Sequence, residues 1–110
     1  MRRGTTPTHT FTLPFELPEG SEVCFVYAQN EVVLVERTTE TCTIKGNTVT
    51  LRLTDKETLL FDQEPHYIDG KYEPYMIEVQ IGIKTPSGDK LVSDIMQDTP
   101  DRIIRKDGII

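Results

Sequence analysis

Residues 77–84 read IEVQIGIK, and this stretch carries the strongest strand signal in the chain. Isoleucine and valine occupy its odd positions, whereas glutamate, glutamine, glycine and lysine occupy its even positions. Strict alternation of this kind indicates a β-strand with one face in a hydrophobic core and the other toward solvent. The pattern therefore predicts that the four odd-numbered side chains are buried.

Working outward from this strand, two hairpins are expected. Residues 21–29 are apolar on both faces, which predicts a central strand, and a tight connection at Gln29-Asn30 leads to a partner strand at residues 32–37. The second hairpin is expected to turn at Gly46-Asn47, a pair able to adopt the positive φ that short hairpin turns require.

The remaining segments read as an edge strand, a capped helical turn and a loop. Phe11, Leu13 and Phe15 alternate with polar residues, and Pro14 restricts this strand to an edge. Thr54-Asp55-Lys56-Glu57 has the spacing of a capping box, so a helix of one or two turns is expected there. Residues 62–74 show no consistent periodicity and are expected to form the longest irregular loop.

Short strands at close spacing with one helical turn near residues 55–60 predict a single fold class. We expect an all-β, immunoglobulin-like antiparallel β-sandwich of about seven strands, as one domain over residues 1–110. A small closed barrel is the alternative architecture. The predicted core consists of Phe11, Leu13, Phe25, Tyr27, Val33, Val35, Val49, Leu51, Leu53, Ile77, Val79, Ile81 and Ile83.

The charge distribution argues against a surface built for nucleic acid or membrane. The net charge is −6, and residues 4–101 contain 17 acidic and 7 basic side chains, whereas both ends of the sequence are basic. The opening residues MRRGTTPTH lack the apolar stretch of a secretory signal, so we interpret them as the lead-in to the first strand. Cys24 and Cys42 are expected to be free thiols.

No residue pattern in the chain points to catalysis or a cofactor. Asp62, Glu64, His66 and Asp69 are the only concentration of metal-capable side chains, but their spacing is not that of a calcium loop. We interpret the cluster as a solvated acidic loop, and His9 as a packed or rim histidine. The sequence therefore predicts a non-enzymatic protein without a cofactor.

Six stretches of the chain together form a recognisable pattern: MRRGTTPTH (1–9), YAQN (27–30), LTDKETLLF (53–61), IEVQI (77–81), SDI (93–95) and KDGII (106–110). They resemble a family of small prophage-encoded proteins of gut Firmicutes, over nearly the whole chain. The order of the opening motif, the LTxxxTLxF corner and the closing hairpin also resembles the amino-terminal immunoglobulin-like domain of phage baseplate upper proteins. A longer loop at residues 62–74 departs from that pattern.

The resemblance implies a tail, neck or baseplate-associated structural protein that acts through contacts with other phage structural proteins. Its location would be the bacterial host cytoplasm and then the virion. The alternative is a binding module that recognises a host glycan or protein through residues 62–75. The residues expected to contact partners are Tyr67, Tyr72, Tyr75, Ile103, Ile104, Ile109 and Ile110.

The four isoleucines of the last nine residues, RIIRKDGII, are too apolar for a solvated tail. Two outcomes are open: a final strand that continues the sandwich, or an exposed strand that pairs with a neighbouring subunit. We favour the second, in which the basic residues meet the acidic middle of another copy and a homo-oligomer forms.

Overall fold

The computed structural model describes residues 1–105 and residue 108. Its elements are, in chain order, β1 (Thr8–Thr12), β2 (Glu22–Gln29), β3 (Val32–Thr38), the 3-10 turn η1 (Thr39–Thr41), β4 (Cys42–Lys45), β5 (Thr48–Arg52), α1 (Asp55–Thr58), β6 (His66–Ile68), β7 (Lys71–Glu73), β8 (Ile77–Lys84), β9 (Lys90–Val92) and β10 (Met96–Asp98).

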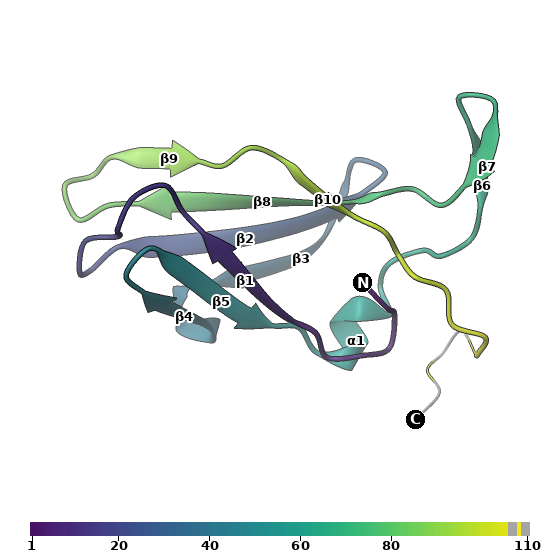
Figure 1. Ribbon diagram of the computed structural model, residues 1–110, viewed down its shortest axis with the longest axis horizontal. Helices are drawn as coiled ribbons and strands as arrows, with labels where there is room; N and C mark the ends of the chain where they lie inside the picture. Colours follow the sequence, from purple (N-terminus) through teal and green to yellow (C-terminus); the bar gives the residue numbers. More distant parts are fainter. Residues whose placement is uncertain (106–107, 109–110) are drawn as a thin grey trace.

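Two antiparallel sheets face each other (Figure 1). One has the strand order β1-β5-β4, and the other has the order β10-β8-β2-β3, with β9 also paired to β8. These orders match strands B-E-D and G-F-C-C′ of an immunoglobulin domain. In the described residues no strand takes the position of strand A, beside β1. The predicted immunoglobulin-like sandwich is confirmed.

The core lies between the two sheets and is built around β8 and β2. All four odd-numbered side chains of β8 are buried, as their alternation predicts, and Ile81 lies opposite Phe25 of β2. Of the other predicted core residues, Phe11 is half-buried against the core and Val33 is exposed. The core also contains Val23 and Phe61, which were not in the predicted set, and Ile103 is buried outside this cluster.

Val33 is a wrong core prediction, and a β-bulge explains the error. Tyr27 pairs with Val35, but the next residue of β2, Ala28, pairs with Val33, so Leu34 is an extra residue in β3. An extra residue inverts which face each following side chain occupies. The side chain of Val33 is therefore 50% exposed on the outer face of the sheet.

Two further expectations are corrected. The described part of the chain contains ten strands instead of about seven. The last strand of the sandwich is interrupted and counts as two, β9 and β10, and the loop at residues 62–74 is not irregular but contains two more strands. Within this loop β6 and β7 form a hairpin that stands away from the two sheets (Figure 1). Each strand of this hairpin has only three residues, which is too short to show an alternating pattern in the sequence.

The capping box at the start of α1 is present. The hydroxyl of Thr54 accepts a hydrogen bond from the N–H of Glu57 at 3.1 Å, and the Glu57 carboxylate accepts one from the N–H of Thr54 at 2.8 Å. The same carboxylate lies 2.7 Å from the guanidinium of Arg37 on β3. The box thus joins the helical turn to the opposite sheet.

We predict that Thr54→Ala lowers the free energy of unfolding by about 0.5–2 kcal/mol, because the N–H of Glu57 loses its acceptor. Urea denaturation followed by circular dichroism measures the change. Lys56→Ala, an exposed substitution inside α1, is the matched control and should change stability by less than about 0.5 kcal/mol. Equal midpoints for Thr54→Ala and the parent would contradict the role of the cap.

Candidate interaction surfaces

Tyr67 and Tyr72 form an exposed aromatic pair on the β6–β7 hairpin. They lie opposite each other in the register, and their ring centroids are 5.3 Å apart. Their exposed fractions are 67% and 77%. The turn between the strands is made by Asp69 and Gly70, both with positive φ. Two adjacent tyrosines exposed on a hairpin offer a large contact area with few rotatable bonds.

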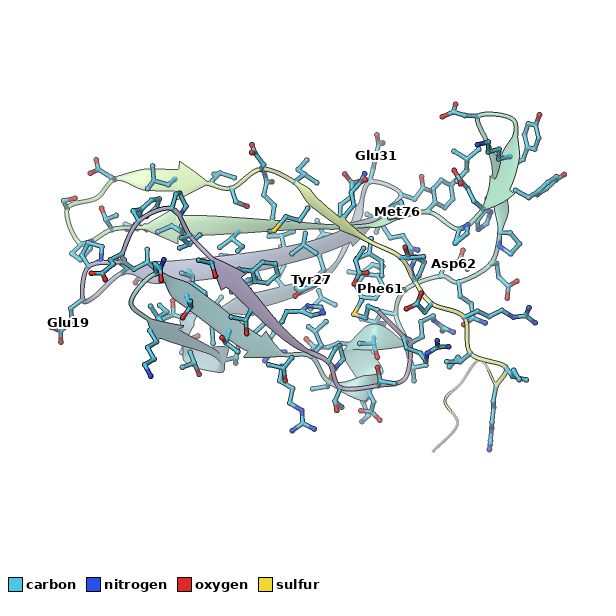
Figure 2. The ribbon with its side chains drawn as sticks, in the orientation of Figure 1. Glu19, Tyr27, Glu31, Phe61, Asp62 and Met76 are labelled. Carbon is cyan, nitrogen blue, oxygen red and sulfur yellow. The ribbon has the colours of Figure 1, made fainter. Side chains whose placement is uncertain are left out.

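Gln29, at the end of β2, holds both ends of the segment that carries the hairpin. Its amide nitrogen donates to the backbone oxygens of Asp62 at 2.7 Å and Tyr75 at 3.0 Å, and its side-chain oxygen accepts from the N–H of Asp62 at 2.6 Å. Gln29 is buried. Figure 2 labels Asp62 at the root of the hairpin, close to the buried ring of Phe61. The hairpin is therefore fixed at its base.

Tyr75 does not join the exposed pair. It is half-buried at the base of the hairpin, where its ring centroid lies 4.9 Å from that of His66. His66 in turn lies 2.8 Å from the Asp62 carboxylate. Partial burial opposes ionisation of Asp62, but hydrogen bonds from the Glu64 backbone and the His66 ring outweigh it and lower the pKa of the carboxyl. These contacts support the hairpin rather than face a partner.

The acidic loop is not gathered into a metal site. Over residues 1–105 and 108, no three His, Cys, Asp or Glu side chains come together in a group that could hold a metal ion. Cys24 and Cys42 are free thiols on half-buried positions, and burial raises the pKa of Cys42. A raised pKa leaves less of the reactive thiolate at neutral pH.

Ile103 is buried within its own chain, which corrects its assignment as a partner contact. Its side chain is 4% exposed and lies near Gly4, and its backbone N–H and oxygen bond to the side chain of Gln63 at 3.0 and 2.9 Å. Ile104, in contrast, is 90% exposed. Ile109 and Ile110 lie outside the described residues.

Gln63 also fixes Arg3. One guanidinium nitrogen of Arg3 donates to Gln63 Oε1 at 2.8 Å and the other donates to the backbone oxygen of Leu59 at 3.0 Å. Arg2 donates to the backbone oxygen of Arg102 at 2.8 Å. The two arginines of the opening stretch therefore hold the last described segment and do not form a free basic arm. Sequence reasoning missed Gln29 and Gln63, because an isolated glutamine carries no periodic signal.

His9 lies against the core. Its Nδ1 atom is 2.8 Å from the phenol oxygen of Tyr27, and the two rings are stacked. Burial lowers the pKa of His9, although the nearby Asp98 carboxylate opposes this effect. Burial also raises the pKa of the Tyr27 phenol. With the phenol protonated and the imidazole neutral, Nδ1 accepts a hydrogen bond from the Tyr27 hydroxyl, so the pair is a core contact, as expected for a packed or rim histidine.

The lowered pKa of His9 predicts that stability falls on mild acidification. At pH values below about 6.5, the ordinary pKa of histidine, His9 binds a proton more readily in the unfolded chain than in the folded chain. The free energy of unfolding therefore decreases as the pH falls. We expect this decrease in urea denaturation as the pH falls through about 6.5 toward the lower pKa of the folded state, and a smaller decrease in His9→Gln. His66 is retained in both proteins and serves as the internal control. Equal pH slopes for the two proteins would contradict the prediction.

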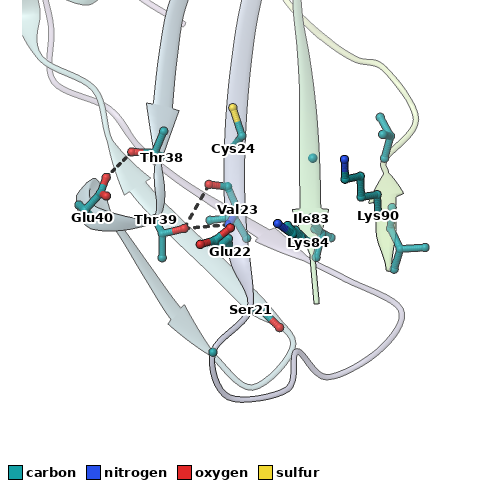
Figure 3. A pocket seen from close by; sticks show the side chains of 14 residues that line it. Ser21, Glu22, Val23, Cys24, Thr38, Thr39, Glu40, Ile83, Lys84 and Lys90 are labelled. Carbon is teal, nitrogen blue, oxygen red and sulfur yellow. Dashed lines mark hydrogen bonds between the residues drawn. The ribbon is translucent and has the colours of Figure 1, made fainter. Parts of the chain in front are cut away.

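An open hollow of about 800 Å³ lies at one end of the β2–β8 sheet (Figure 3). Its lining includes Gly82, which has no side chain, and the adjacent Cys24. The charged lining residues are of both signs, Glu22 and Glu40 beside Lys84 and Lys90. In Figure 3 the hydroxyl of Thr39 bonds to the backbone of Val23 at this rim. The mixed charges define no ligand class.

No known protein family, curated protein or solved structure matches the chain. In the part of the chain that the structure describes, the helices are also too short to cross a bilayer. The class that fold and surface define is therefore an immunoglobulin-like β-sandwich with an exposed tyrosine hairpin.

Proposed function

We propose that this chain is a structural component of a phage or prophage particle, associated with the tail, neck or baseplate. It acts through protein–protein contacts and carries out no catalysis. It is made in the bacterial host cytoplasm and is then incorporated into the virion. Its partners are other phage structural proteins, and it uses neither a cofactor nor nucleic acid or membrane.

The observation that carries this proposal is that the described part of the sandwich has unpaired sheet edges on which another chain can pair. The edges of both sheets are unpaired in the described residues, and unpaired edges readily accept a strand from another chain. The phage context comes from the resemblance of the sequence stretches quoted above.

Affinity capture from an induced lysogen that carries the gene tests the proposal. Tagged protein should retain identified tail, neck or baseplate proteins, and Glu19→Lys, at an exposed side chain outside the sheet edges and the hairpin, should retain the same set. Capture of host envelope proteins or glycans, without any phage structural protein, would overturn the proposal.

The second candidate function is a binding module for a host glycan or protein. The exposed pair Tyr67 and Tyr72 favours it, because aromatic side chains dominate many binding hot spots. The double variant Tyr67→Ala, Tyr72→Ala separates the two functions. If it abolishes partner capture while removal of the carboxy-terminal segment does not, docking through sheet edges is wrong and the hairpin is the binding site.

A further inference from the structure

A groove runs along the open side of the sandwich, between β1 and the strands β9 and β10. It consists of two hollows of about 530 and 290 Å³ that share Thr10, Phe11 and Met96. Core residues of both sheets, among them Leu13 and Ile83, lie at its apolar floor. This is the position beside β1 that strand A occupies in an immunoglobulin domain.

The backbone of β1 is free to pair along this groove. Leu53 N–H donates to the oxygen of Pro7, and Leu13 N–H donates to the oxygen of Asn47. Bonded and non-bonded pairs alternate along an antiparallel ladder, so the odd-numbered residues of this stretch bond to β5. The N–H and C=O groups of Thr8, Thr10 and Thr12 therefore point to the open side.

The groove is acidic as well as apolar. Of the described residues that line it, the only ones with a formal charge at neutral pH are Asp94 and Asp98, and Asp98 is ion-paired at 3.0 Å with the terminal ammonium of Met1. The negative charge available to an occupant is therefore that of Asp94. Neither Ile103 nor Gly108 of the same chain lines it, and Gly108 lies beside Gly4 and Leu59 near α1. The occupant must supply an extended backbone, apolar side chains and positive charge.

We propose that this groove binds residues 104–110 of a second copy of the chain, as an added strand paired with β1. This segment, IRKDGII, has three isoleucines, two basic residues and one aspartate, so its side chains carry a net positive charge. Seven extended residues span about 23 Å, close to the roughly 26 Å of chain from Thr8 to Phe15. Ile103 stays in its own chain as the pivot, and the exposed Ile104 begins the exchanged strand.

The inference deepens the proposed function, since it names one partner of the structural module as a copy of the same chain. It is tested separately, because capture of other tail proteins does not depend on self-association. Reciprocal exchange closes a dimer, and exchange in one direction gives a ring or a filament.

Sedimentation velocity of the full chain over a range of concentrations is the test. We expect a concentration-dependent oligomer that weakens with added salt, because part of the attraction is between exposed charges. Asp94→Lys should weaken association by about tenfold or more, whereas Glu36→Lys, with the same change in net charge on the other edge of the sheet, should not.

Two further variants address the backbone and the occupant. Thr12→Pro removes an N–H that faces the open edge and should give a folded monomer, since proline is tolerated where the N–H faces solvent. Arg105 as the last residue keeps the Ile103 contacts and should also give a monomer. A full chain that is monomeric at all concentrations overturns the proposal, as does association that survives both Asp94→Lys and the truncation.

Discussion

Replacing Ile81 by alanine is expected to lower the free energy of unfolding by about 2–5 kcal/mol, a large part of the stability of a small domain. Ile81 is 1% exposed and lies mid-strand in β8, between β2 on one side and β9 and β10 on the other. Truncation leaves a cavity that the two flanking sheet strands cannot close without breaking their ladders. The decrease in the free energy of unfolding therefore includes both the lost hydrophobic burial of the side chain and its lost packing contacts.

Urea denaturation followed by circular dichroism measures this loss. Val33→Ala is the matched control, because Val33 is in the same sheet but on its outer face, and its truncation should cost less than about 1 kcal/mol. If the two substitutions have equal effects, the assignment of the buried face of β8 is wrong.

Gln63→Met is the second substitution with a large expected effect. Methionine keeps the length and volume of the side chain but can replace none of its bonds to Arg3 and Ile103. It leaves one nitrogen of the buried Arg3 guanidinium and both backbone groups of Ile103 without their Gln63 partner, while the other guanidinium nitrogen keeps its bond to Leu59. We expect a loss of about 2–5 kcal/mol in stability.

Limited trypsin digestion adds a second readout for Gln63→Met. The segment after Asp101 is held to the sandwich through Ile103, so cleavage at Arg102 and Arg105 should become faster than in the parent. Gln97→Met, at an exposed glutamine, is the control and should leave both stability and cleavage unchanged. Parent-like behaviour of Gln63→Met in both measurements would contradict the role of the side chain.

The sandwich and the buried faces of its main strands could be predicted from local sequence patterns alone. The alternation in residues 77–84 predicts the buried face of β8, because side chains of a strand alternate between two faces regardless of what packs on them. The turn at Gly46-Asn47 and the capping box at Thr54 are also local, since each depends on residues at most three positions apart. Such features need no knowledge of the tertiary structure.

Features that depend on contacts between residues distant in sequence could not be predicted before the packing of the sheets was known. The β-bulge near Tyr27 places the side chain of Val33 on the outer face of the sheet, and no residue pattern in β3 predicts this bulge. Gln29 and Gln63 bond to segments more than thirty residues away, so their role follows from where those segments pack. Likewise, the groove exists because β1 and β10 are edges of different sheets, a relation that the packing of the sheets creates and no local pattern encodes.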